Sequence, residues 1–249
     1  TRWYDLGIFS LQPAELLKLG LVIYTSAFLT LDSKKKKEQE KIINSNKDSF
    51  FKYFVSNLLT KYQHFTLMGF IAFLIFAQRD LDTLIILFLI FVSIYFAGEE
   101  KEGKGIKATF LLGVASIIGI LSIVIEQYRR IRFLSFLEIL FKGEPSKEFR
   151  LGESFQVWNG LVAIGSGGFF GLGYGESRQK LFFLQEASYT DSIFAVLGEE
   201  FGLMGSFIVI LGFIYFLSAG LSIAKNTTNK TASLIATGIT LWIVIQAFL

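Results

Sequence analysis

The chain has 249 residues, of which 52% are hydrophobic and 18% are charged, and its formal net charge is +3. Soluble domains of this size rarely combine so many apolar residues with so few charged ones, and so small a net charge gives no reason to expect a nucleic-acid partner. The absence of cysteine and the single histidine, His64, exclude disulfides, iron–sulfur clusters, thiolate zinc sites and imidazole metal sites. A hard divalent cation held by carboxylates, such as Mg²⁺ or Mn²⁺, is the one metal cofactor left open.

The apolar residues lie in long blocks that predict membrane-spanning helices. Leu84 to Ala97 and Ala108 to Ile125 are apolar nearly all round, as helices facing lipid or buried in a bundle are. Taking about 20 apolar residues as one span, we predict an all-α, polytopic transmembrane helical bundle forming a single integral membrane domain over residues 1–249. The expected spans are residues 13–31, 64–78, 81–98, 107–127, 192–222 and 232–249.

The connections between the spans predict the orientation of the chain. Residues 33–62 hold eight lysines against three acidic residues, and short basic loops stay in the cytoplasm. We therefore expect a cytoplasmic basic loop at 32–63 and a large extracellular loop at 128–191, between the fourth and fifth spans. Anchoring the topology is enough to explain the run Lys34 to Lys37.

The extracellular segment is too long to be a mere connection, because structureless loops beyond about 12–15 residues are usually functional or disordered. It contains an amphipathic stretch, Phe133 to Phe141, a weakly apolar helix, Phe155 to Ile164, and glycines at 165, 167, 168, 171, 173 and 175. A dinucleotide-binding fingerprint is rejected, because Phe170 stands where its third glycine would be and no strand–helix unit surrounds it. Two interpretations stay open: a compact loop whose amides face an anionic ligand, or a purely structural turn region.

Carboxylates gather where this segment meets the fifth span, at Asp191, Glu199 and Glu200. Thr190 or Asp191 is well placed to cap the helix, and capping alone would account for either residue. Carboxylates within or at the edge of the membrane are also functional candidates by default. We favour a functional role for Asp191.

Charged residues elsewhere carry two interpretations each. Glu15 and Lys18 share one face of the first span, where they can pair in the membrane or act separately as an interfacial acid and a snorkelling lysine. Arg129, Arg130 and Arg132 can clamp a phosphate near the outer head groups or anchor the segment to anionic lipid. Both alternatives stay open for each group.

Several short motifs occur in the order in which one known family has them. They are Gln12-Pro13-Ala14-Glu15 with Lys18, Gln78-x-Asp80-Leu81-x-Thr83, Tyr128-Arg129-x-x-Arg132, Ala163 to Gly168, Gln179-Lys180, and Thr190-Asp191 followed by Gly198-Glu199-Glu200. Together they resemble the SEDS family, the FtsW/RodA/SpoVE proteins of bacterial shape, elongation, division and sporulation, across nearly the whole chain. Ser177-x-Gln179-Lys180 leans toward the division-type branch, FtsW, whereas Gln185 to Asp191 lacks the proline usual in the family.

The two ends of the chain indicate a fragment of that family fold. Thr1 to Asp5 is not a signal peptide, and the chain stops inside the apolar run Leu241 to Leu249. We expect that the first spans and the C-terminal end of the fold are absent.

The resemblance implies a peptidoglycan glycosyltransferase that polymerises lipid II at the outer face of the bacterial cytoplasmic membrane, in cell division, at the septum, or in cell-shape maintenance. It maps the family's catalytic aspartate onto Asp191. The implied partners are lipid II, membrane lipid and a class B penicillin-binding protein transpeptidase. The residues expected to bind substrate are Glu15, Lys18, Arg129, Arg132, Gln179, Lys180, Thr190, Glu199 and Glu200.

A lipid II flippase or transporter is the alternative function, since it would share the spans, the intramembrane carboxylates and the basic residues. Transporters place their essential charges near the bilayer midplane on broken helices. The densest polar motif of this chain is in an outer loop, which favours chemistry at the membrane surface. A scaffold that only activates a transpeptidase is a third interpretation.

Overall fold

The structure, a computed structural model, describes residues 4–5, 7, 10–43, 66–78, 80–98, 127–144, 146, 155–184 and 191–248. Its elements are almost all helical. In chain order they are β1 (Tyr4–Asp5), β2 (Ser10–Leu11), α1 (Pro13–Ile43), α3 (Leu81–Gly98), α5 (Gln127–Lys142), α7 (Phe155–Ser166), the π-helix η1 (Lys180–Leu184), α8 (Ile193–Asn226) and α9 (Lys230–Phe248). A further apolar helix covers Thr66–Ala77.

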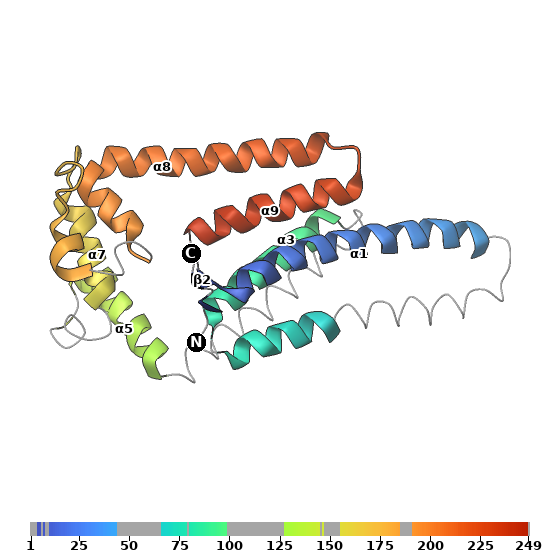
Figure 1. Cartoon of the computed structure of the whole chain (residues 1–249), viewed down its shortest axis with the longest axis horizontal. Coiled ribbons are helices and arrows are strands. Elements are labelled where there is room, and N and C mark those ends of the chain that lie inside the picture. Colours follow the sequence, from blue (N-terminus) through green and yellow to red (C-terminus); the bar gives the residue numbers. More distant parts are fainter. Residues whose placement is uncertain are drawn as a thin grey trace. The chain divides into compact units, whose positions relative to one another are not determined.

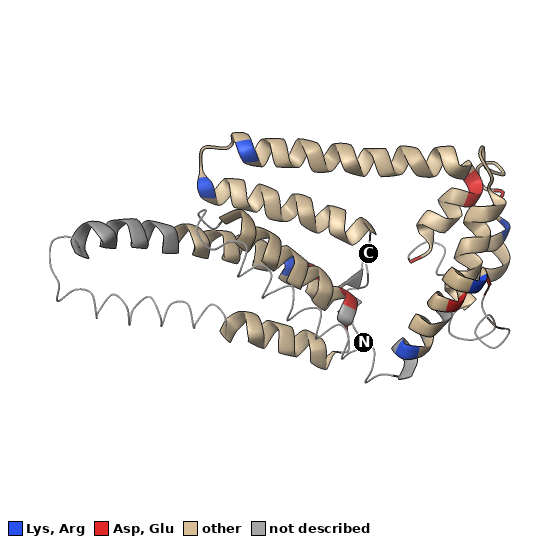
Figure 2. Ribbon diagram, turned by 180° about the vertical axis from the view of Figure 1, so that it is seen from behind, with Lys and Arg blue, Asp and Glu red and all other residues tan. Residues whose placement is uncertain are grey.

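The helices confirm the predicted polytopic, all-α membrane fold. The first part of α1 (Pro13–Leu31), α8 and α9 are long and apolar enough to cross a membrane, and Thr66–Ala77 and Asp82–Gly98 are shorter apolar helices. The span predicted at 107–127 lies outside the described residues, apart from Gln127 at the start of α5. Figure 2 shows that Lys, Arg, Asp and Glu are sparse along α8 and α9.

Two features differ from the predicted elements. The two-residue strands β1 and β2 pair antiparallel, with Tyr4 opposite Leu11, and the sequence pattern did not indicate this hairpin. Helix α1 continues beyond Leu31 to Ile43, so the first part of the basic segment 32–63 is helical. Lysine, glutamate and glutamine are good helix formers, which explains the extension, and the rest of that segment lies outside the described residues.

The chain divides into two compact units, residues 1–111 with 216–249, and residues 112–215. In the first unit α1, α3 and α9 pack against one another (Figure 1). Gly238 permits this contact, since a β-carbon there would lie 2.7 Å from Val22 Cγ1 and from Ile94 Cδ1. The buried hydrophobic core of the unit is Leu21, Val22, Ile75, Ile86, Leu87, Ile90, Phe91, Ile94 and Leu234.

A short connection joins α8 to α9 within the same unit. Asn229 caps α9, because its side-chain oxygen accepts a hydrogen bond from the backbone N–H of Thr231 (3.0 Å). The hydroxyl of Ser233 donates to the carbonyl of Ala224 at 2.6 Å. The connection is thereby tied to both helices.

Candidate functional site: the start of helix α8

Helix α8 is broken at Gly202, which has φ 67° and ψ −164°. Only glycine adopts this backbone region at little cost. A β-carbon there would also lie 2.7 Å from the carbonyl oxygen of Phe169. The break thus requires glycine for both conformation and space, and it separates a short first section of α8 from a long second one.

The glycine-rich segment 167–175 satisfies the backbone groups that the break deprives of helical partners. The hydrogen bonds are Leu172 N to Glu199 O (2.9 Å), Gly173 N to Glu200 O (3.0 Å), Leu203 N to Gly168 O (2.9 Å) and Met204 N to Phe169 O (3.2 Å). A β-carbon on Gly167 or Gly171 would overlap the backbone of α8. Close backbone packing therefore accounts for these two glycines, which supports the structural interpretation of the segment.

Glu199 lies in the first section of α8 and is only 1% exposed. Its carboxylate accepts a hydrogen bond from the Ser177 hydroxyl (2.5 Å) and from the backbone N–H groups of Arg178 and Gln179 (3.2 Å each). The exposed Ser166 hydroxyl is a further donor at 3.3 Å. Amides of the segment between α7 and α8 do face an anion, but that anion is a side chain of the protein itself.

Ser177 links this carboxylate to the helical turn that precedes η1. Its buried hydroxyl donates to Glu199 and accepts from the backbone N–H of Lys180 at 3.1 Å, which is the geometry of a helix N-cap. Carboxylates are favoured at a helix N-terminus by the exposed amides. Glu199 and Ser177 together fix where Gln179 and Lys180 lie. The sequence motif Ser177-x-Gln179-Lys180 contains this serine but does not indicate its contact with Glu199.

Glu200 is also buried, at 6% exposed, but its carboxylate has a different partner. The ammonium of Lys180 lies 3.8 Å from Oε1 of Glu200, and that oxygen accepts no hydrogen bond. The side-chain oxygen of Gln179 is likewise buried without a hydrogen bond. The structure therefore brings together three of the residues expected to bind substrate, Gln179, Lys180 and Glu200, around Glu199.

Asp191 stands apart from these glutamates. It is exposed and precedes α8. The residue at the cap position is Ser192, whose carbonyl accepts from the N–H groups of Ala195 and Val196 and whose hydroxyl accepts from Gln156 Nε2 of α7 at 3.2 Å. Capping therefore does not explain Asp191, and its carboxylate makes no hydrogen bond or ion pair with the residues that the structure describes.

Other predicted residues lie elsewhere or are not described. Thr190 is outside the described residues, and so are the side chains of Arg129 and Arg132, although both arginines belong to α5. In the first unit, Lys18 donates to Oε1 of Glu15 at 2.6 Å, which is the intramembrane pairing that their spacing suggested.

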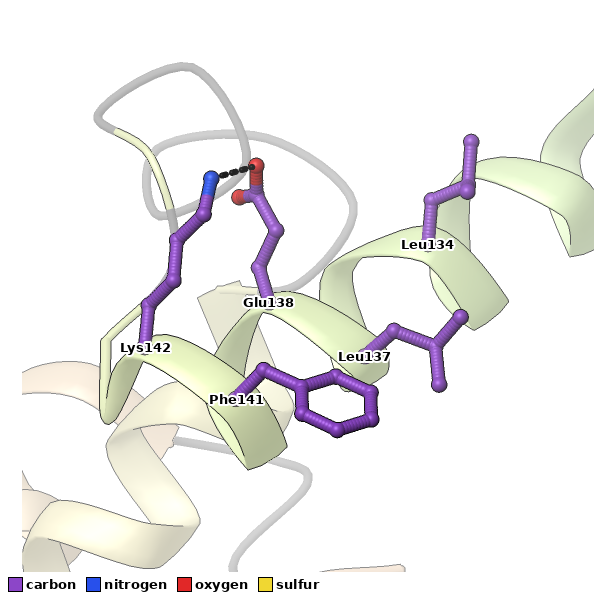
Figure 3. A pocket seen from close by; sticks show the side chains of 5 residues that line it. All are labelled: Leu134, Leu137, Glu138, Phe141 and Lys142. Atoms are coloured by element: carbon purple, nitrogen blue, oxygen red, sulfur yellow. Dashed lines mark hydrogen bonds and ion pairs between the residues drawn. The ribbon is translucent and has the colours of Figure 1, made fainter.

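Helix α5 carries an open pocket on its own surface, lined by Leu134, Leu137, Glu138, Phe141 and Lys142 (Figure 3). The backbone N–H of Ser146 donates to Glu138 at 3.0 Å, and Lys142 lies 3.2 Å from the other carboxylate oxygen. The Ser146 amide, and to a lesser degree Lys142, hold the pKa of Glu138 below its ordinary value of 4.5. These contacts tie the chain beyond α5 back to the helix.

The described residues form no ready-made binding site for a divalent cation. No group of three or more His, Asp or Glu side chains there is arranged to hold a metal ion. The buried oxygens of Glu200 and Gln179 are hard ligands, but the ammonium of Lys180 already occupies the surroundings of Glu200. The described part of the site does not fit a metal centre.

The whole chain is similar to known proteins. A family model described as "Cell cycle protein", FtsW/RodA/SpoVE, matches residues 1–249. The chain is 30% identical to a probable peptidoglycan glycosyltransferase FtsW of Taylorella equigenitalis, over 99% of this chain and 60% of the relative. It is 32% identical to one of Tolumonas auensis, over 98% and 57%, and 34% identical to stage V sporulation protein E of Bacillus subtilis, over 99% and 60%. The chain thus spans somewhat more than half the length of these relatives.

Proposed function

Because the chain belongs to the FtsW/RodA/SpoVE family, we propose that the protein it comes from polymerises lipid II into glycan strands at the outer face of the bacterial cytoplasmic membrane. Relatives named peptidoglycan glycosyltransferase support this activity. The observation that carries the proposal is the difference between the carboxylates of the site. Glu199 is buried and accepts hydrogen bonds, and Glu200 is buried beside Lys180, whereas Asp191 is exposed just before the start of α8.

In the proposed reaction Asp191 acts as the general base. Its carboxylate takes the proton of the 4-hydroxyl of the acceptor's N-acetylglucosamine, and that oxygen attacks the anomeric carbon of the donor's N-acetylmuramic acid. The bond from the anomeric carbon to the pyrophosphate oxygen breaks with inversion, and the lipid pyrophosphate leaves with the electron pair. Lys18, Arg129 and Arg132 are proposed to stabilise this leaving group electrostatically.

The remaining residues are proposed to orient the sugars. Gln179, Lys180 and Thr190 would donate hydrogen bonds to them, with Glu200 paired to Lys180 and Glu15 to Lys18. Glu199 would act indirectly, since its carboxylate holds the backbone of Gln179. A class B penicillin-binding protein transpeptidase is the proposed protein partner, and the division septum is the proposed location.

Replacing Asp191 with asparagine in the full-length protein tests the assignment. The amide cannot accept the proton, so polymer formed from fluorescent lipid II and read on a gel should fall by about 100-fold or more. Glu176→Gln is the matched control, because Glu176 is an exposed carboxylate of the same segment and should leave polymerisation unchanged. Both variants should unfold at the wild-type temperature in detergent.

The same assay separates the alternative function. Transbilayer movement of lipid II by the wild-type protein without any polymer would support a flippase and overturn the proposal. Undiminished polymerisation by the Asp191→Asn variant would keep the activity but reject Asp191 as the base.

A further inference from the structure

A polar cluster joins α1 and α9 in the first unit. At its centre is Lys18, which is 1% exposed. Its ammonium donates to Glu15 Oε1 at 2.6 Å and to Gln246 Oε1 at 2.9 Å. A buried charge in a membrane helix is costly unless it is paired and hydrogen-bonded, so the second acceptor, from α9, contributes to keeping Lys18 where it is.

Trp242 fixes the orientation of that acceptor. The indole N–H donates to Gln246 Oε1 at 2.6 Å, so one amide oxygen accepts from both Trp242 and Lys18. With the amide rotated by half a turn, its NH₂ group would face two donors, which excludes that orientation. The Trp242 ring centroid also lies 5.7 Å from the Lys18 ammonium, within the range of a cation–π contact.

The geometry leaves part of the Lys18 ammonium uncommitted. An ammonium has three N–H donors, and among the described residues two are used, by Glu15 and Gln246. The Lys18 side chain is only 2% exposed, whereas the Glu15 side chain is 37% exposed, so Glu15 is the accessible side of the cluster. An anionic oxygen arriving there could accept the third N–H only if the ammonium is held in one rotamer.

We propose that Gln246 and Trp242 are positioning residues for Lys18, which hold its ammonium so that one N–H is presented to an oxyanion of the substrate. This rests on the proposed function, in which Lys18 faces the pyrophosphate. Glu15 alone cannot hold the ammonium this way, because it lies on the same helix and constrains it from one side. The acceptor on α9 adds the constraint from the other side.

Three substitutions in the full-length protein test the proposal. Gln246→Leu removes the acceptor at similar volume, and Gln246→Glu keeps acceptor oxygens within the same reach. Trp242→Phe removes the indole N–H and keeps a smaller aromatic ring beside Lys18. Gln246→Leu should lower kcat/KM for lipid II polymerisation by about tenfold or more, since small displacements of a charged group are costly. Gln246→Glu should retain most of the activity, and Trp242→Phe should fall between them.

A double-variant comparison separates positioning from general stability. In the Lys18→Met background Gln246→Leu should cause no further loss, because the ammonium that it positions is gone. A further loss of the same size there, or failure of Gln246→Glu to retain activity, would overturn the proposal.

A chemical readout covers the case in which no polymerisation is seen. Trace acetylation with acetic anhydride, followed by mass spectrometry, should label Lys18 several-fold faster in Gln246→Leu than in the wild type, relative to the exposed Lys142 in the same sample. An unchanged ratio would overturn the positioning role. Faster labelling of Lys18 with an inactive wild-type protein would support positioning while rejecting the proposed function.

Discussion

Asp191, Glu199 and Glu200 lie close together in the sequence, yet they meet different surroundings. Glu199 accepts hydrogen bonds from two backbone amides and two serine hydroxyls, Glu200 lies beside Lys180, and Asp191 is exposed. Composition and spacing could mark all three as candidates but could not separate them. The burial of the two glutamates depends on Ser177, which lies 22 positions before Glu199, and on the break at Gly202. Neither feature has a periodic signal in the sequence.

Ser177→Ala should destabilise the start of α8. The hydroxyl is buried, donates to Glu199 and accepts from Lys180, so its loss leaves a carboxylate oxygen and an amide short of one partner each. The expected cost is about 1–3 kcal/mol, seen as a lower unfolding temperature of the full-length protein in detergent. Ser166→Ala is the control, because that exposed hydroxyl also reaches the carbonyl of Ala163 at 2.9 Å. Equal shifts for the two variants would contradict the assignment of Ser177.

At the scale of elements, the long apolar blocks predicted the helices well. The helix boundaries at Pro13, Leu81 and Gly98 agree with the predicted spans. The extension of α1 to Ile43 was not predicted, because a run of apolar residues marks only the part of a helix that lies in the membrane. A polar continuation of the same helix has no such run. The break in α8 was not predicted, because the hydrophobic pattern of an apolar run is the same whether or not one of its glycines has a positive φ.

Two glycines of α8 provide a matched test of that break. Gly202→Ala should destabilise the protein by several kcal/mol, because a side chain adds about 1–3 kcal/mol of backbone strain and would overlap the backbone of Phe169 and Gly171. A β-carbon on Gly212 meets nothing within 4 Å, so Gly212→Ala should be neutral or should stabilise by up to about 1 kcal/mol through helix propensity. Unfolding temperatures in detergent compare the two, and equal effects would show that α8 has no break at Gly202.

The end of α5 should respond to pH through Glu138. Because hydrogen bonding in the folded protein lowers its pKa below 4.5, its contribution to local stability is present above pH 4.5 and is lost as the pH falls through the lowered value. Hydrogen exchange of the Ser146 amide should therefore be faster in Glu138→Gln than in the wild type at pH 7. The ratio of the two rates should approach one when Glu138 becomes protonated. A ratio independent of pH would contradict the role of the carboxylate.

For the whole molecule, the sequence predicted the helical membrane class and the family. It could not predict how the segment between α7 and α8 packs against α8. The hydrogen bonds between the glycine-rich segment and α8 depend on close approach of two backbones, and the Lys18–Gln246 contact joins residues 228 positions apart. Such contacts are decided by packing, which a single sequence does not display.

The orientation of the chain can be tested because it contains no cysteine, so single cysteines introduced into it have no background within these residues. From Leu203 to Asn226, α8 rises roughly 36 Å at 1.5 Å per residue, more than the roughly 30 Å of the hydrocarbon core. Its two ends should therefore lie on opposite sides of the membrane. Glu176 and Thr228 are exposed positions in the segments before and after this helix. A membrane-impermeant maleimide should label Glu176→Cys in spheroplasts and Thr228→Cys only after lysis, and the reverse pattern would contradict the predicted topology.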